Sequence, residues 1–282
     1  MPSGFLLIDK DAGVTCRHID NHFQHLFSCP TGHLGTLDPF ATGLLVLAIG
    51  DATKLLPIID DSYKTYVATL KFGVETDTLD SLGQITNTAD VPVLNEEKIT
   101  KVLKSFIGIT EQIPPRYSAK QIAGKRAYDL AREGQTFQLK PIKIDVESIK
   151  LISFSKDEIA FEVSISKGGY IRSLGRDIAT KLNTVGHLIS LRRTKVGKLS
   201  ISQCKHVADI NSEDLIKMND FFPDIPTVKI ESKLLKRVSN GADIKLNQDS
   251  EFIFISHSDQ LLALYKKVDD HYHCYKGFQH EH

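Results

Sequence analysis

The sequence has no closely spaced cysteines. Its 282 residues include four cysteines, Cys16, Cys29, Cys204 and Cys274, and none of them belongs to a CxxC pair. Structural zinc sites use closely spaced ligands, and disulfide frameworks use cysteines in regular spacings. The cysteine pattern therefore argues against both and fits a reducing compartment.

Long apolar runs and an N-terminal targeting signal are also absent from the sequence. The opening residues, MPSGFLLIDKDAG, contain no extended hydrophobic region and no small-residue cleavage pattern. No stretch approaches the roughly 18 consecutive apolar residues that a membrane-spanning helix needs. We therefore expect a soluble, cytoplasmic protein that does not cross a membrane.

A net charge is the third missing feature, because 35 Lys and Arg balance 35 Asp and Glu. The charges are unevenly distributed, however. Residues 167–200 carry eight Lys or Arg against one Asp, and residues 114–143 carry seven against two acidic residues. Such segments can bind phosphates, although a solvated charged face explains the charge pattern alone equally well.

Hydrophobic periodicity predicts a fold of the α+β class. Strands are predicted at residues 4–9, 44–49, 66–72, 159–165 and 191–197. Helices are predicted at residues 17–27, 95–106, 125–133 and 171–182. The Gly- and Pro-rich residues 30–39 predict a loop. Because the strands come in runs between helices, α+β is favoured over a regular βαβ alternation.

The chain is expected to divide at a linker flanked by Pro223 and Pro226. Beyond this linker the helix signal fades, and Asn240-Gly241 indicates a turn. Short strands are predicted there at residues 243–246, 251–255 and 261–265. We therefore expect a large domain at residues 1–222 and a small β domain at residues 223–282.

One stretch combines conformationally special residues with an acid. Residues 32–45, GHLGTLDPFATGLL, place three glycines, a proline and Asp38 directly before a buried strand. Glycine allows close approach of the backbone to a ligand, and proline stiffens the loop after Asp38. An acid on such a loop suits an active site, but a lone Asp before Pro more often caps a turn.

The whole block resembles motif II of the TruB pseudouridine synthases, whose pattern is close to GHxGTLDPxATGLL. Further blocks resemble that family in the same order, up to about residue 200: GFLLIDKDAGVT, KTYVATLKFGVETDTLDSLGQI, QIPPRYSAKQIAGKRAYDLAREG, SKGGYIRSLGRDIATKL and LRRTKVG. The first block departs from the family pattern, since Asp11 replaces a usual proline and Cys16 a common serine. We interpret Cys16 as a small buried residue, because no activating histidine is evident nearby.

The resemblance implies a fold and a function. The fold would be a pseudouridine synthase core with a mixed, mainly antiparallel sheet flanked by helices, an RNA-facing insertion at about residues 75–140, and a small PUA-like C-terminal domain. The reaction would convert uridine 55 in the TΨC loop of tRNA into pseudouridine. The partner would be the T arm of tRNA, bound by a monomer that needs no protein partner, cofactor or metal.

The resemblance also implies roles for individual residues. Asp38, Tyr66 and Arg172 match the family's catalytic aspartate, the tyrosine that packs on the target base and the arginine that pairs with the aspartate. The residues expected to bind the substrate are His33, Lys10, Tyr170 and Leu191, with His33 helping to displace the base. The residues expected near RNA phosphates are Lys120, Lys125, Arg126, Arg192, Arg193 and Lys195, with Lys198 beside them.

The chemistry of the reaction explains why one carboxylate and one arginine suffice. Breaking the N1–C1′ bond builds positive charge on the sugar, which an ionised carboxylate stabilises or attacks. Enclosure raises the pKa of Asp38, and Arg172 would lower it again. The isomerisation transfers no electrons, which agrees with the lack of a P-loop or GxGxxG motif in the sequence.

Two other functions remain open on the sequence. The chain could bind or fold tRNA without catalysis, or it could be an RNA glycosidase that releases free uracil. The tail residues His271, His273, Cys274, His280 and His282 could also suggest a metal site. Their spacing fits no structural zinc pattern, so we expect no metal there.

Overall fold

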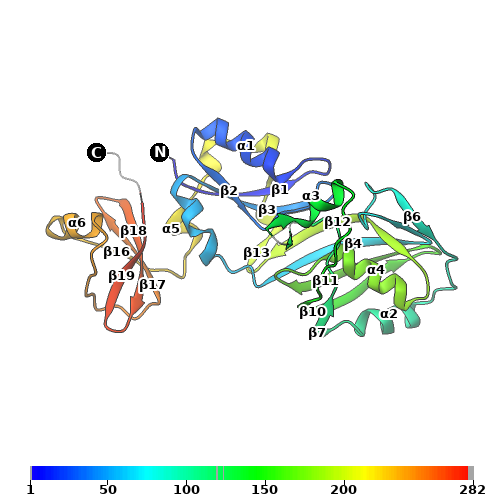
Figure 1. The fold of residues 1–282 in the computed structure, drawn as a ribbon. Helices are drawn as coiled ribbons and strands as arrows, with labels where there is room; N and C mark the ends of the chain where they lie inside the picture. The colour runs from blue at the N-terminus through cyan, green and yellow to red at the C-terminus, as the bar shows by residue number, and fades with distance from the viewer. Residues whose placement is uncertain (1, 119, 123, 279–282) are drawn as a thin grey trace.

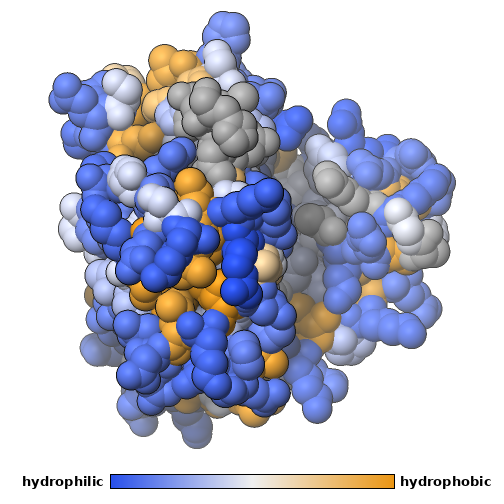
Figure 2. Space-filling view, turned by 90° about the vertical axis from the view of Figure 1, so that its left-hand side faces the viewer, coloured by the Kyte–Doolittle hydropathy of each residue, from blue (hydrophilic) through white to orange (hydrophobic). Residues whose placement is uncertain are grey.

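The computed structural model describes residues 2–118, 120–122 and 124–278, and Figure 1 shows a large sheet within them and, apart from it, a smaller sheet near the C-terminus. The large sheet has 11 strands and the smaller one has four, and two further sheets have two strands each. Viewed from the side of the small sheet, the surface is mostly hydrophilic around a central apolar patch (Figure 2). No helix of the described residues is long and apolar enough to cross a membrane.

The large sheet is mixed and mainly antiparallel, as predicted. Its main path runs β14 (Lys205–His206), β1 (Gly4–Lys10), β3 (Thr42–Ile49), β12 (Gly186–Val196), β4 (Tyr63–Phe72), β11 (Glu158–Ser166), β10 (Ile142–Phe154) and β7 (Gly108–Gln112). Three short strands lie off this path: β2 (Thr31–Leu34), β13 (Leu199–Ser200) and β15 (Ile216–Lys217). Within the sheet only β1–β14 and β3–β12 are parallel. The β3–β12 pair is central, and the loop before β3 carries Asp38.

Three helices cover one face of this sheet: α1 (Cys16–Phe27), α2 (Glu96–Lys104) and α4 (Ile171–Lys181). The predictions for these helices are confirmed. The Thr15 and Asn95 side chains cap the first two by accepting hydrogen bonds from the amides of His18 and Lys98. The apolar stripe of α4 is buried against strands β4 and β12.

The strands differ in how many faces they bury. In β1, Leu6 and Ile8 join the core under the helices, whereas Phe5 and Leu7 join a second core on the opposite face. Burial on both faces explains why this strand is a continuous apolar run. Strand β4 alternates between buried and half-buried residues, so one of its faces is buried. Tyr66 lies on that buried face.

The second core is covered by the 3₁₀ helix η1 (Gly50–Ile58), by α5 (Met218–Phe221) and by the small sheet. The rings of Phe5 and Phe221 stack with centroids 4.0 Å apart. Phe254 of the small sheet belongs to the same cluster. Three further 3₁₀ turns lead towards α5, namely η2 (Ile201–Gln203), η3 (Val207–Asp209) and η4 (Ser212–Asp214).

The C-terminal segment differs from the prediction in four places. It contains β16 (Thr227–Lys229), α6 (Ser232–Ser239), β17 (Phe252–His257), β18 (Gln260–Val268) and β19 (His271–Gly277). Helix α6 and strands β16 and β19 were not predicted, because each is short and largely polar. The strand predicted at residues 243–246 is wrong, since Ile244 makes only an isolated bridge to Tyr272.

The segment between β4 and β10 holds short elements around the predicted insertion. They are β5 (Val74–Thr76), β6 (Ile85–Thr88), β8 (Gln121–Ile122), β9 (Lys125–Arg126) and α3 (Ala127–Arg132). The helix predicted from residue 125 begins at Ala127, because the two residues before it pair with β8. The loop predicted at residues 30–39 likewise contains β2, which pairs with β3.

Candidate active site

Lys10 holds the Asp38 loop, residues 35–41, through its ammonium group. The ammonium group of Lys10 donates to the carbonyl oxygens of Ala41 at 2.6 Å, Asp11 at 2.8 Å and Pro39 at 3.3 Å. The side chain is fully buried, and this burial lowers the pKa of Lys10. Lys10 therefore contacts backbone carbonyls around the loop, and it is not part of the cavity wall described below.

Gly43 allows β12 to approach the end of the Asp38 loop. Its φ is +106°, and a Cβ atom built there would lie 2.3 Å from the carbonyl oxygen of Arg193. Gly43 pairs with Arg193 in the parallel β3–β12 ladder. A glycine at this position thus brings β12 against the residues that follow Asp38.

Cys16 lies beneath the same loop. Its sulfur accepts a hydrogen bond from the Leu37 amide at 3.2 Å and lies 3.4 Å from the Leu37 carbonyl oxygen. Burial raises the pKa of the Cys16 thiol. This environment agrees with the interpretation of Cys16 as a small buried residue.

Arg172 joins Asp38 to the insertion. Its guanidinium donates to Asp38 Oδ1 at 2.8 Å, to the Thr78 carbonyl at 2.8 Å and to the Tyr117 carbonyl at 2.9 Å. The Asp80 carboxylate lies 3.5 Å from the same guanidinium. The Arg172 side chain is 6% exposed and that of Asp38 is 33% exposed. The buried Arg172 guanidinium therefore lies close to two carboxylates, those of Asp38 and Asp80.

Burial raises the pKa of Asp38 above its ordinary value of 3.8. The charge of Arg172 opposes this shift, and the negative charge of Asp80 adds to it. The arginine thus offsets the effect of burial without cancelling it. Asp38 is a carboxyl group whose ionisation is sensitive to its neighbours.

A cavity of about 430 Å³ opens beside Asp38. Its wall includes six of the predicted site residues: Asp38, Tyr66, Tyr170, Arg172, Leu191 and Arg193. The structure therefore brings together side chains from β4, β12, the first turn of α4 and the Asp38 loop. The volume is in the range of ordinary small-molecule sites, which is about 300–1,000 Å³.

His33 lies on β2, outside the walls of this cavity. Its Nδ1 is 2.9 Å from Asp20 Oδ2, and its Nε2 is 3.1 Å from Thr36 Oγ1. Asp20 belongs to α1 and is buried. The His33 ring is thus held between a helix and the beginning of the Asp38 loop.

The predicted RNA-facing cations of the insertion are Lys120, Lys125 and Arg126. Lys120 is exposed. Lys125 is exposed as well and lies 4.0 Å from the Glu133 carboxylate. The side chain of Arg126 lies outside the part of the chain that the structure describes. These residues lie on and around the short β8–β9 hairpin.

The cations of β12 and the residues after it have different environments. Arg192 makes two hydrogen bonds to the Asp9 carboxylate, at 3.0 and 2.6 Å. Lys195 is exposed, and the exposed Lys198 pairs with a carboxylate at 2.9 Å. Arg193 is 1% exposed and forms part of the cavity wall. Arg193 thus faces the interior of the site.

Three residues of the site were not singled out from the sequence. Asp80 reaches Arg172, and Lys64 lines the cavity. The buried Gln112 side chain pairs with both backbone groups of Tyr170, at 2.8 and 3.1 Å. Asp80 and Lys64 fall within the KTYVATLKFGVETDTLDSLGQI block, but their convergence on Arg172 and the cavity depends on folding over many residues.

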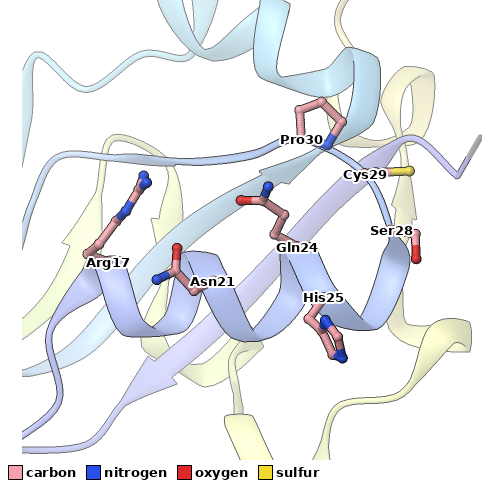
Figure 3. A pocket seen from close by; sticks show the side chains of 7 residues that line it. All are labelled: Arg17, Asn21, Gln24, His25, Ser28, Cys29 and Pro30. Atoms are coloured by element: carbon pink, nitrogen blue, oxygen red, sulfur yellow. The ribbon is translucent and has the colours of Figure 1, made fainter.

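A second hollow, of about 680 Å³, lies beside α1 and the turn after it (Figure 3). It is lined by Arg17, Asn21, Gln24, His25, Ser28, Cys29 and Pro30. These residues include no carboxylate, so this hollow offers no counterpart of the Asp38–Arg172 pair. No group of three or more His, Cys, Asp or Glu is arranged for a metal ion within the described residues, and His280 and His282 lie outside them.

Two solved structures share this fold. A chain of a Cbf5–Nop10–Gar1 complex matches with a TM-score of 0.65 and 24% identity, over 93% of this chain and 78% of that one. A chain of an H/ACA RNP bound to a substrate RNA containing 2′-deoxyuridine matches with a TM-score of 0.67 and 22% identity, over 98% and 85%. The chain therefore has the fold of these two solved structures, and its cavity holds Asp38 against Arg172.

Sequence comparison identifies the particular family. The family model described as TruB family pseudouridylate synthase (N terminal domain) matches residues 26–171. A tRNA pseudouridine synthase B of Mycoplasma mobile is 39% identical over 92% of this chain and 88% of its own length. The Aquifex aeolicus protein of the same name is 38% identical over 89% and 94%. The chain belongs to the TruB family.

Proposed function

We propose that this chain converts uridine to pseudouridine in tRNA, at position 55 of the TΨC loop. The observation that carries the proposal is the Asp38 carboxylate, held at 2.8 Å by Arg172 in the wall of a cavity. Membership of the TruB family supports the proposal. So do the relatives named tRNA pseudouridine synthase B, which this chain matches over nearly their whole length. Position 55 is what the resemblance to the TruB family implies.

The reaction is an isomerisation in which atoms and electrons balance. The N1–C1′ bond breaks, the uracil turns, and a C5–C1′ bond forms while C5 loses a proton and N1 gains one. Ionised Asp38 stabilises or attacks the reacting nucleotide. Addition to the sugar, addition to the base and abstraction of a 2′ proton all require this carboxylate.

The cavity wall supplies contacts for a uracil ring. The Tyr66 ring, on the buried face of β4, stacks on the base, and its hydroxyl assists the loss of the C5 proton. Leu191 and Tyr170 complete the apolar and polar wall beside it. Aromatic stacking recovers part of the free energy that the base loses when it leaves the RNA stack.

The target base must leave its stacked position, at a cost of a few kcal/mol. His33 fills the space that the base vacates, and its pairing with Asp20 and Thr36 fixes the ring for this purpose. Lys10 supports the reaction by holding the Asp38 loop. The cations that would lie near the RNA backbone are Lys120, Lys125, Arg126, Arg192, Arg193, Lys195 and Lys198.

The remaining assignments concern the whole chain. The catalytic domain would be residues 1–222, with the RNA-facing insertion at about residues 75–140. Residues 223–282 would form the small PUA-like domain. The enzyme would work in the cytoplasm as a monomer on the T arm of tRNA, with no protein partner, cofactor or metal.

The test is to incubate the protein with an unmodified tRNA transcript and to map pseudouridine by position. Conversion at uridine 55 is expected, without free uracil in the product mixture. Tight binding without any modification would instead support a non-catalytic tRNA-binding protein. Release of free uracil would indicate an RNA glycosidase.

A further inference from the structure

Two buried polar atoms lack a hydrogen-bond partner in the part of the chain that the structure describes. They are Ser118 Oγ and Arg193 Nη2. Both residues line the cavity that holds Asp38. Buried polar groups in proteins are nearly always hydrogen-bonded, and exceptions point to a missing water, ion or ligand. The cavity is therefore incomplete without an occupant that accepts hydrogen bonds.

Arg193 is the stronger of the two signals because it carries a charge. Its Nε donates to the Leu44 carbonyl at 2.8 Å, whereas its buried Nη2 has no partner among the described residues. No carboxylate of the described residues forms an ion pair with it, whereas its neighbour Arg192 binds Asp9 at 2.6 Å. A buried charge without a counter-ion is costly, so a negative ligand would stabilise it.

A second cation converges on the same part of the wall. A Cβ atom built on Gly35 would lie 3.2 Å from Lys64 Nζ and 3.5 Å from Arg193 Nη1. All three residues line the cavity. The absence of a side chain at Gly35 thus leaves room beside both buried cations, which suits a ligand group that needs close approach.

The charged groups at the site form two clusters. In the first, the single cation Arg172 faces two carboxylates, Asp38 and Asp80. In the second, the Asp61 carboxylate lies 3.0 Å from Lys64 and 2.9 Å from Lys167, and Arg193 has no carboxylate partner among the described residues. The formal charge of the first cluster is negative and that of the second is positive.

A nucleotide has a matching polarity, because its uracil is neutral and its phosphates are anionic. We infer that Arg193, with Lys64 beside it, binds a phosphate of the flipped uridine and thereby turns the ribose carbon towards Asp38. The inference rests on the proposed function. It adds that the phosphate is the part of the substrate that Arg193 and Lys64 recognise. The phosphate comes from the linkage on the 5′ or on the 3′ side of the uridine.

A charge-removal cycle tests this contact. The substrates are T-arm RNA hairpins with one uncharged methylphosphonate linkage, placed 5′ of the target uridine, 3′ of it, or in the stem as a control. The enzymes are the wild type, Arg193→Met, Arg193→Lys and the control Lys150→Met, which removes an exposed lysine paired with Glu162 on the outer part of the sheet. The single-turnover rate and the dissociation constant are measured for each pair.

In the wild type and in Lys150→Met, a methylphosphonate at one of the two flanking linkages should lower the single-turnover rate or the affinity by about ten- to a hundredfold. This factor is expected for the loss of a hydrogen bond between charged groups. On unsubstituted RNA, Arg193→Met should be weaker than the wild type by the same factor. The methylphosphonate at that linkage should then cause no further loss in Arg193→Met. Arg193→Lys should lie between them. An equal methylphosphonate effect in the wild type and in Arg193→Met at both linkages would overturn the inference.

Two controls keep the result interpretable. Near-UV circular dichroism and thermal melting check that the variants fold, and if Arg193→Met does not fold, Arg193→Lys and Lys64→Met carry the cycle. If the wild type binds unsubstituted RNA but forms no pseudouridine, the proposed function fails. The phosphate contact is then judged from the dissociation constants alone, so that the two failures are distinguishable.

Discussion

At the scale of single residues, Arg172 determines how Asp38 is presented. Its guanidinium binds the Asp38 carboxylate and two carbonyl groups of the insertion, those of Thr78 and Tyr117. A planar guanidinium offers five donors in a fixed fork, which a lysine ammonium cannot reproduce. The direction of the carboxylate therefore depends on the insertion as well as on the Asp38 loop.

The raised pKa of Asp38 predicts a pH dependence of activity. Since the carboxylate is the active form, kcat/KM should rise with pH through an apparent pKa above 3.8, the ordinary value for aspartate. The negative charge of Asp80 contributes to that shift. Asp80→Asn should therefore move the acid limb to lower pH, whatever it does to the maximal rate.

The measurement is the pH profile of kcat/KM for pseudouridine formation, compared between the wild type and Asp80→Asn. Asp90→Asn, at an exposed carboxyl group, serves as the control and should keep the wild-type profile. An acid limb that stays in place or moves to higher pH in Asp80→Asn would contradict the assignment of Asp38 as the titrating carboxyl group.

At the scale of elements, the parallel contact between β3 and β12 positions the site. Gly43 has a φ of +106°, and a Cβ atom there would lie 2.3 Å from the Arg193 carbonyl oxygen. Gly43→Ala should therefore destabilise the protein by about 1–3 kcal/mol or more through backbone strain and displacement of β12. Urea unfolding measures this change.

Gly277→Ala is the matched control, because no atom of the described residues lies within 4 Å of a Cβ atom built there. It should change the free energy of unfolding by no more than about 0.5 kcal/mol. Equal stability of Gly43→Ala and the wild type would show that β12 does not depend on close approach at residue 43.

The elements that the sequence predicts well are those with a strong local pattern. The apolar run of β3, the alternation of β11 and the stripe of α4 each occupy one continuous segment. Strand β2 was missed because it is short and formed only by pairing with β3. Helix α6 was missed because it spans eight residues and is mainly polar.

The candidate site was predictable only in part. Asp38, Tyr66 and Arg172 stand out through the family resemblance, and the structure gathers them at one cavity. Asp80 and Gln112 act on Arg172 and Tyr170 through contacts between segments that are distant in sequence. No local sequence pattern indicates such contacts. The burial of Arg193 could not be predicted for the same reason, because it depends on segments that are distant in sequence.

At the scale of the whole molecule, the small four-stranded sheet shares a core with the large sheet. Phe254 and Phe278 belong to the same cluster as Phe5, and the Lys54 ammonium donates to the Gly277 carbonyl at 2.7 Å. A shared apolar core couples the stabilities of the units that form it. The two sheets should therefore unfold in one transition.

Phe254→Ala tests this coupling. The side chain is fully buried, so its loss should lower the free energy of unfolding by about 3–5 kcal/mol. Urea unfolding should give coincident transitions for a probe on the small sheet and a probe on the large one, in both the wild type and the variant. Separate transitions in the wild type would show that the small sheet and the large sheet unfold independently.

The reaction of the whole molecule with tRNA depends on a single acidic side chain in the cavity. Asp38→Asn keeps the shape of that side chain and removes its charge. It should bind an unmodified tRNA transcript within a few-fold of the wild type, since the phosphate contacts remain. Its chemistry should be lost, because Asp61, the other carboxylate in the described cavity wall, pairs with Lys64 and Lys167 instead.

Single-turnover formation of pseudouridine in an unmodified tRNA transcript, with wild type and Asp38→Asn side by side, is the most direct measurement of this dependence. The wild type should convert one uridine per transcript. Asp38→Asn should be slower by more than about a thousandfold while still binding the RNA. A rate in Asp38→Asn within tenfold of the wild-type rate would contradict the role of Asp38.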